Sequence, residues 1–347
     1  MKTDRIENPS SIDRVAIEAK IAAGTHVVLQ FGKPCYTPEL IKRINNLCGE
    51  FGKNLEVRFY GHYQTQFDCS ILRHLPDVAS LSVDCLLEAT NLSILNGLAN
   101  LRCLSLGIYK LDDQNILKSL QLRDLEKLIL SETAKANIDL TPLEACNKLA
   151  ELYLVGHTKN IRCLSNLAML RTLSLGHIPK KQSLEFVSKI QSLRRLIVIL
   201  GGRESISEIQ HPSLEELKVL RVLGFNNIDS IQAFPALRSL VIEDQIRLER
   251  VRFSSSNKHI RSFSIHNCKT LRGLEGLEYL TNLMSISIGM TALDIDSILQ
   301  QRFAASLEMF SFFTRGQKTN AEIRKKLDAR GYRECSSSDV ANLPATP

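Results

Sequence analysis

The strongest constraint on the fold is an internal repeat that occupies most of the chain. Eleven segments follow the pattern apolar-x-x-apolar-x-apolar, and their middle residues recur at intervals of 21 to 24 residues. All 33 template positions are apolar, although hydrophobic residues make up only 44% of the sequence. Such a period predicts stacked units that are each too small to bury an apolar side alone. The middle residues are Leu81, Leu104, Leu128, Leu152, Leu173, Leu196, Leu217, Leu240, Phe263, Ile286 and Phe310.

Each repeat predicts one short strand followed by a return segment. The apolar residues of the strand turn inward, while the residues between them point to the opposite face. Return segments such as 113–120, 141–149 and 183–191 carry apolar residues at helical or 3₁₀ spacing. Two weaker strand copies precede the array, at 26–31 and 54–59. The pattern therefore predicts an α/β solenoid with a curved parallel sheet and a convex side of helices and 3₁₀ turns.

The repeat also suggests a division of the chain. Residues 1–53 are predicted to form an N-terminal helical cap with the first strand; one helix covers 12–23 and another starts at Thr37, with Pro38 in its first turn. Residues 54–315 form a solenoid of about 11–12 repeats. Residues 316–334 form a C-terminal capping helix that starts at Thr319 or Asn320, and residues 335–347 form a mobile tail.

The repeats resemble the leucine-rich repeat family, particularly the short-repeat group with bacterial internalin-like and SDS22-like proteins. The resemblance implies a solenoid fold and says little about function. The chain departs from the family five residues after each middle residue, where the family carries asparagines that bond to backbone. That position holds Leu86, Tyr109, Thr133, His157, Ile178, Gly201, Val222, Gln245, Cys268, Thr291 and Arg315.

No catalytic motif accompanies the repeats, so no enzyme and no cofactor are predicted. Nine cysteines form no CxxC pair, and the N-terminus lacks the apolar core of a signal peptide. These features favour free thiols and a cytoplasmic location. His157 and His177 stand in similar places in neighbouring repeats. They leave a two-histidine metal site as one alternative, with hydrogen bonding to backbone as the favoured interpretation.

The outward strand positions define a candidate protein-binding face. They combine an apolar and aromatic stretch with charges of both signs, as in the core and rim of many interfaces. An ordinary sheet surface, which favours such residues anyway, is the alternative. The candidate residues are Arg58, Tyr60, Asp84, Lys127, Glu151, Tyr153, Arg195, Ile197, Glu216, Lys218, Val241, Glu243 and His266.

A second lane lies six to eight residues after the middle residues, on the loops that leave the strands. Stacking would align its cations into a basic rim, which a solvated lysine-rich edge would also explain. The rim residues are Lys110, Lys135, Lys159, Lys180, Lys181, Arg203 and Lys269.

These features predict a non-enzymatic scaffold that binds a protein partner of unknown identity on its concave face. An inhibitor or immunity role, a phosphatase-regulator role and delivery into a host are compatible with such a scaffold. The alternative of another class is nucleic-acid or polyanion binding through the basic rim. The formal net charge of +7 over 347 residues supports it only weakly. No membrane partner is expected.

Overall fold

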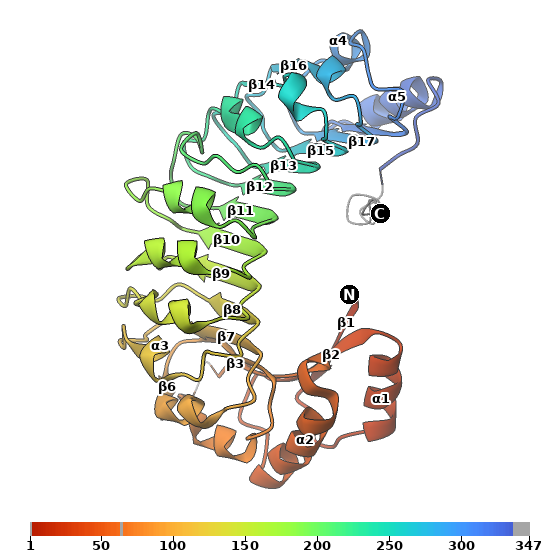
Figure 1. Ribbon diagram of the computed structural model, residues 1–347. Coiled ribbons are helices and arrows are strands. Elements are labelled where there is room, and N and C mark those ends of the chain that lie inside the picture. Colours follow the sequence, from red (N-terminus) through yellow and green to blue (C-terminus); the bar gives the residue numbers. More distant parts are fainter. Residues whose placement is uncertain (1, 63–64, 336–347) are drawn as a thin grey trace. The chain divides into compact units, whose positions relative to one another are not determined.

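The computed structural model describes residues 2–62 and 65–335, and the predicted tail lies almost entirely outside this range. The chain divides into two compact parts, residues 1–170 and 171–347. Each part is a run of parallel strands with short helices on one side (Figure 1). This architecture confirms the predicted solenoid class. The division into cap, solenoid and capping helix remains a prediction.

The N-terminal part contains seven strands of the main parallel sheet, in the order β1-β2-β3-β5-β7-β8-β9. Cross-strand registers such as Leu81↔Leu104↔Leu128 place the middle residues of successive repeats side by side. These leucines are at most 2% exposed, so each repeat buries its apolar side against its neighbours. The strands are Lys2–Glu7 (β1), Thr25–Phe31 (β2), Leu55–Gly61 (β3), Ser80–Leu86 (β5), Cys103–Ile108 (β7), Lys127–Leu130 (β8) and Glu151–Val155 (β9).

Helices and 3₁₀ turns form the return segments of this part. The α-helices are Arg14–Ala22 (α1), Pro38–Phe51 (α2) and Ile116–Ser119 (α3). The 3₁₀ helices are Gly52–Asn54 (η1), Cys69–His74 (η2), Leu92–Gly97 (η3), Thr141–Ala145 (η4) and Ile161–Asn166 (η5). A two-stranded sheet joins Phe67–Asp68 (β4) to Ala89–Thr90 (β6). The Thr37 hydroxyl accepts a hydrogen bond from the Leu40 amide at 3.2 Å, which confirms the predicted start of α2.

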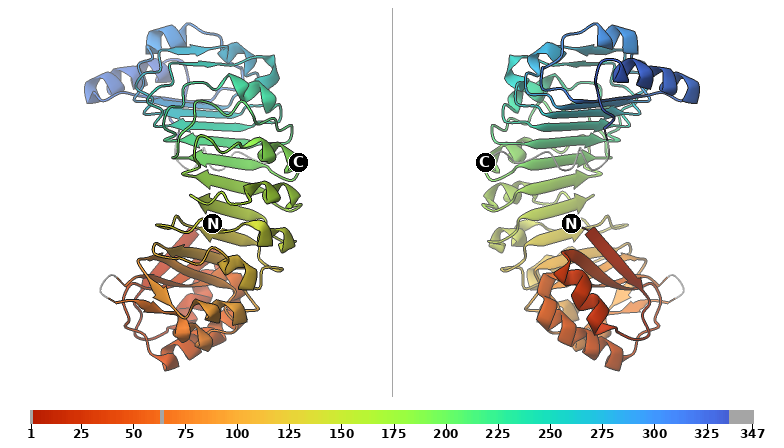
Figure 2. Two further views of the ribbon diagram at one scale, coloured as in Figure 1. Left: turned by 90° about the vertical axis from the view of Figure 1, so that its left-hand side faces the viewer. Right: turned by 90° about the vertical axis from the view of Figure 1, so that its right-hand side faces the viewer.

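Strand β1 is the strand of the main sheet that the sequence did not predict; the short paired strands β4, β6, β14 and β16 were not predicted either. Its segment has only one apolar residue, Ile6, and most of its side chains are exposed. It forms because its backbone pairs with β2 in register, Lys2↔Thr25 to Glu7↔Gln30. Asp4 also forms an ion pair with Lys20 of α1 at 2.6 Å. Two further views show α1 and α2 beside this end of the N-terminal part (Figure 2).

The C-terminal part contains the other seven strands, in the order β10-β11-β12-β13-β15-β17-β18. They are Thr172–Gly176 (β10), Arg195–Ile199 (β11), Glu216–Leu220 (β12), Ser239–Glu243 (β13), Ser262–His266 (β15), Ser285–Gly289 (β17) and Met309–Phe313 (β18). A separate pair joins Arg250–Arg252 (β14) to Gly273–Glu275 (β16). The 3₁₀ helices are Glu185–Lys189 (η6), Asp229–Ala233 (η7), Ser255–Asn257 (η8) and Leu277–Tyr279 (η9). The α-helices are Ile295–Leu299 (α4) and Gln317–Asp328 (α5).

The start of α5 differs from the prediction. The helix begins after Gly316, so Thr319 and Asn320 lie inside its first turn. Asn320 instead fastens the preceding loop: its side-chain oxygen accepts from the Thr314 amide at 2.7 Å, and its amide donates to the Thr314 carbonyl. Asn320, which the sequence suggested as a helix cap, therefore stabilises the connection between β18 and α5.

Six consecutive repeats of the C-terminal part end their strands in a left-handed backbone conformation. The φ angles lie between 49° and 60° at His177, Leu200, Arg221, Asp244, Asn267 and Met290. Residues other than glycine rarely adopt this backbone conformation, which costs them about 1–2 kcal/mol each. The amide of each residue donates to a carbonyl of the next strand, for example Leu200 to Leu220 at 2.9 Å. The ladder of parallel strands therefore imposes the conformation on Leu200, Arg221 and Met290, which do not favour it, whereas histidine, aspartate and asparagine adopt it more readily.

Gly276 lies where the stacked loops leave no space for a side chain. It has a φ of 80°, and an added Cβ would collide with the Phe253 carbonyl oxygen of the preceding repeat. We expect Gly276→Ala to lower the free energy of unfolding by at least about 1–2 kcal/mol, measured by urea denaturation. The control is Gly97→Ala, where the same methyl group would meet no atom within 4 Å. Equal effects of the two substitutions would contradict this account.

Candidate functional site

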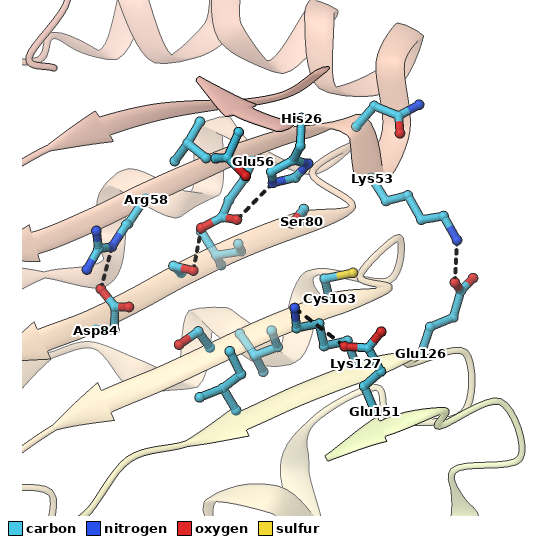
Figure 3. Close-up of a pocket in the computed structure, with 18 of the residues that line it drawn as sticks. His26, Lys53, Glu56, Arg58, Ser80, Asp84, Cys103, Glu126, Lys127 and Glu151 are labelled. Atoms are coloured by element: carbon cyan, nitrogen blue, oxygen red, sulfur yellow. Dashed lines mark hydrogen bonds and ion pairs between the residues drawn. The ribbon is translucent and has the colours of Figure 1, made fainter. Parts of the chain in front are cut away.

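The clearest candidate site is an open hollow on the inner face of the N-terminal part. It has a volume of about 590 Å³ and lies over β1, β2, β3, β5, β7, β8 and the start of β9. Small floor residues, Ser82 and Ser105, leave the space open, and charged side chains surround it (Figure 3). Because successive outward positions face the same side of a sheet, the repeat itself gathers these groups. The acidic, basic and histidine residues of the lining are Arg5, His26, Lys53, Glu56, Arg58, Asp84, Glu126, Lys127 and Glu151.

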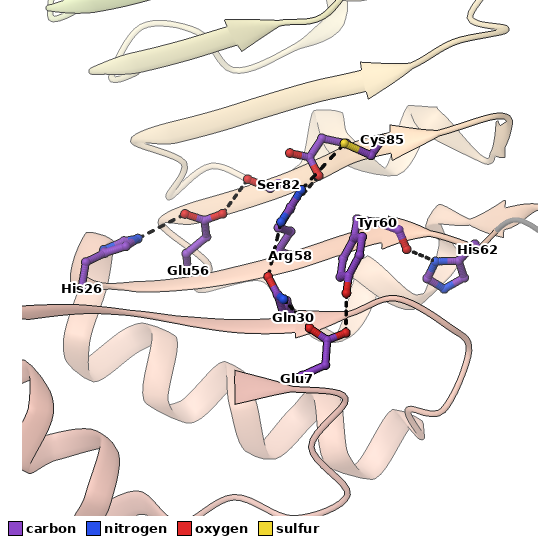
Figure 4. Close-up of polar contacts among 10 residues, drawn as sticks. Glu7, His26, Gln30, Glu56, Arg58, Tyr60, His62, Ser82 and Cys85 are labelled. Atoms are coloured by element: carbon purple, nitrogen blue, oxygen red, sulfur yellow. Dashed lines mark hydrogen bonds and ion pairs between the residues drawn. The ribbon is translucent and has the colours of Figure 1, made fainter. Parts of the chain in front are cut away.

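Arg58 is the centre of the polar floor. Its Nε donates to Asp84 on the neighbouring strand at 2.8 Å, and its Nη1 reaches the Gln30 side chain at 3.3 Å. The guanidinium also lies 4.6 Å from the centre of the Tyr60 ring, and Tyr60 in turn hydrogen-bonds to Glu7 of β1. Contacts to Tyr60 on its own strand and to side chains on both neighbouring strands, β2 and β5, hold Arg58 in one position (Figure 4).

A second chain of hydrogen bonds runs across the same strands closer to their start. His26 Nε2 lies 3.1 Å from Glu56, and the Ser82 hydroxyl donates to the other oxygen of Glu56 at 2.7 Å. Burial by itself would raise the pKa of Glu56, but the hydrogen bonds from His26 and Ser82 hold this pKa below its usual value. Glu56 is therefore a fixed negative charge on the floor.

The far side of the hollow carries another set of pairs. Lys53 binds Glu126 at 2.6 Å, and Lys127 lies 3.6 Å from Glu151. The Lys127 ammonium is also 5.5 Å from the centre of the Tyr153 ring. Arg5 is exposed at the edge, and no carboxylate pairs with it among residues 2–62 and 65–335. Opposite charges on adjacent strands therefore neutralise most of the hollow, and one cation remains.

The C-terminal part carries the remaining residues of the predicted face. Arg195 makes a bidentate pair with Glu216 on the next strand, at 2.5 and 2.9 Å. Ile197 and Lys218 lie in one cross-strand row with Val241, which is only 8% exposed and offers less contact area than predicted. In the adjoining row Glu243 is beside His266, whose Nε2 lies 3.0 Å from the Ser287 hydroxyl.

The predicted basic rim is not a uniform ridge of charge. Lys110 pairs with Glu88 and Lys180 with Glu204, both at 2.5 Å. Arg203 is a correction to the prediction, because it is 6% exposed and points into the fold. There it bonds to Glu208 at 2.9 Å and to the Gln182 carbonyl. Lys159 contacts the Gln114 side chain, whereas Lys135, Lys181 and Lys269 are exposed.

His157 has the backbone role that the sequence favoured. It is 1% exposed, its Nδ1 accepts from the Ile138 amide at 3.3 Å, and its Nε2 donates to the Ser131 carbonyl at 2.9 Å. Both nitrogens are therefore occupied and cannot bind a metal. Gln245 replaces the family asparagine in a similar way, since its amide donates to the Val219 carbonyl at 3.1 Å. Across the described residues, no group of three or more potential metal ligands occurs.

Sequence reasoning missed the residues that β1 and β2 contribute to the hollow. Arg5 and Thr3 lie on the unpredicted β1, and His26 is at the start of β2. His26 could have been found by extending the outward lane two residues toward the strand start. Nothing in the segment around Arg5 indicated a strand.

Comparison with known proteins places the fold. No family model matches the chain, and neither does any curated protein. Among solved structures, an internalin (inlF) from Listeria monocytogenes has a TM-score of 0.53 and 16% identity, over 84% of this chain and 78% of that chain. A leucine-rich repeat protein from Leptospira interrogans covers 88% of this chain and 93% of its own at 14% identity, but its TM-score of 0.38 is too low to support an argument.

The repeat, the parallel strands and the likeness to the internalin agree. The chain has the leucine-rich repeat fold, as the resemblance implied. At this level of identity the likeness concerns the fold alone. In the described part of the chain, no helix combines the length and the apolar character needed to span a membrane.

Four histidines make the fold sensitive to acid. Burial lowers the pKa of His62, His157, His211 and His266. Each therefore binds its proton less readily in the folded state than in the unfolded one, so the stability present at neutral pH is lost below about 6.5. We expect the free energy of unfolding to decrease from pH 7.5 to pH 5.5, and His157→Gln to weaken that decrease. The control is His259→Gln at an exposed position; an equal change of slope in both variants would contradict the role of His157.

Proposed function

We propose that this protein is a non-enzymatic scaffold that binds a protein partner on the concave face of its sheet. The observation that carries the proposal is the hollow of the N-terminal part, where charges are already fixed by partners on adjacent strands. A binding surface that is ordered in advance loses little conformational entropy when it binds. The small serine floor leaves room for side chains of a partner.

The composition of this face supports a protein rather than a polyanion. The hollow combines Arg58, Lys53 and Lys127 with Glu56, Asp84, Glu126 and Glu151, so its charges nearly balance. Tyr60 and Tyr153 add partly exposed aromatic surface next to these cations. Tyrosine beside arginine or lysine is typical of the residues that dominate protein interfaces. Balanced charges set the orientation of a partner more than its affinity.

Polyanion binding through the rim is the weaker alternative. Two of its predicted cations are paired with carboxylates and a third, Arg203, is buried. Lys135, Lys181 and Lys269 stay exposed, but the paired and buried cations between them interrupt the row that the sequence suggested. An inhibitor, a phosphatase regulator and a delivered effector all remain compatible with the scaffold, and the cytoplasmic location remains a prediction. All nine cysteines are free, with four of them buried, which suits a reducing compartment.

The test uses the full chain with single substitutions in its N-terminal part. Each variant serves as bait in a pull-down from a lysate of the cells that express the protein. Lys127→Glu and Tyr153→Ala each remove one member of the contact between the ammonium and the ring. We expect each variant to bind the captured partner at least about 10-fold more weakly, a loss of about 1.4 kcal/mol. Affinity of the identified partner is then measured by calorimetry at low and moderate salt.

The matched control is Arg162→Glu, an exposed charge reversal on η5 of the same part. It must retain the partner, and circular dichroism must show all three variants folded. Loss of binding in the control as well would contradict the concave face as the site. Capture of nucleic acid alone, released by salt from every variant, would replace the proposal with the rim alternative.

A further inference from the structure

An apolar notch interrupts the rim of the C-terminal part. Leu223 is 65% exposed and Ile246 is 58% exposed, more than any other large apolar side chain described in this part. They line a hollow of about 320 Å³ together with Leu200, Arg221 and Asp244. Scattered single exposed leucines are ordinary, but adjacent ones around a hollow are typical of interaction sites.

The backbone holds these side chains outward. The Leu223 amide donates to the Gly201 carbonyl and its carbonyl accepts from the Arg203 amide, both at 3.1 Å. Leu200 is fixed in a left-handed conformation with a φ of 59°, and a Cβ on Gly201 would lie 2.6 Å from the Ile178 carbonyl oxygen. The loops therefore have little freedom to fold the apolar groups inward.

Two ion pairs on the loops at and near the notch, Arg221 with Asp244 and Lys180 with Glu204, each have a further cation nearby. The Asp244 carboxylate accepts a hydrogen bond from Arg221 at 2.9 Å. It also interacts electrostatically with Lys269. Glu204 forms an ion pair with Lys180 at 2.5 Å and interacts electrostatically with Arg247. Each of the two carboxylates thus has two cations, which leaves an excess of positive charge beside an apolar surface. A ligand that complements both features carries acidic groups and an aliphatic side chain.

We propose that this notch binds an acidic segment of a partner protein, which inserts a leucine or isoleucine side chain between Leu223 and Ile246. The acidic flanks of the segment pair with Arg221, Arg247 and Lys269. This site does not depend on the concave-face function, because it lies on the loops of the C-terminal part and uses none of the strand residues proposed there.

The experiment uses the full chain and three labelled 12-residue peptides in fluorescence anisotropy. The first has the centre Glu-Asp-Leu-Leu-Asp-Glu, the second reverses its charges to lysine and arginine, and the third replaces both leucines by serine. We expect the first peptide to bind at least about 10-fold more tightly than either of the others. The double substitution Leu223→Asp with Ile246→Asp should weaken its binding at least about 10-fold.

The matched control is Tyr279→Asp, which changes an apolar side chain that is 44% exposed on η9. It should bind the first peptide as the natural chain does. Should the double aspartate variant fail to fold, Leu223→Ser with Ile246→Ser gives the same comparison without added charge. Equal binding of the charge-reversed peptide, equal binding of the serine peptide, or no binding of any peptide would each overturn the proposal.

Discussion

The rest of the structure depends on the inability of any single repeat to bury its own apolar side. One strand and one short return segment leave apolar side chains exposed until another copy covers them. Stacking in register solves this problem, and it places equivalent residues of successive repeats about 4.8 Å apart. Everything on the inner face and along the rim follows from that spacing, because side chains at one repeat position become direct neighbours.

This spacing explains why the inner face of the N-terminal part is a set of ion pairs rather than free charges. Arg58 meets Asp84 and Lys127 meets Glu151 because each pair occupies matching or adjacent positions on neighbouring strands. Such pairs contribute little to stability when they are partly exposed. Their effect is to fix the positions of charges in advance, which is the property that a recognition surface needs.

The same stacking places carboxylates of one repeat beside rim cations of a neighbouring repeat. The sequence positions of the loop cations predict a continuous basic ridge. In the structure, however, Glu88 and Glu204 pair with two of these cations. Arg203 is drawn into the fold by Glu208 five residues later, while Leu223 and Ile246 stay outside. The rim of the C-terminal part therefore combines an apolar notch with nearby cations, which differs in kind from a continuous polyanion site.

The sequence by itself determined the solenoid, the strands of its main sheet from β2 onward, the start of α2 and the alternation of inward and outward strand residues. These follow from periodicity, since a strand alternates its faces whatever its neighbours are. Only the tertiary structure decided β1, whose backbone pairs with β2 although its sequence has a single apolar residue. It also decided which charges are neutralised, which backbone groups His157 contacts, and that six residues adopt a left-handed conformation. The physical reason is that these features depend on which atoms the neighbouring repeat supplies, and a linear pattern does not record those distances.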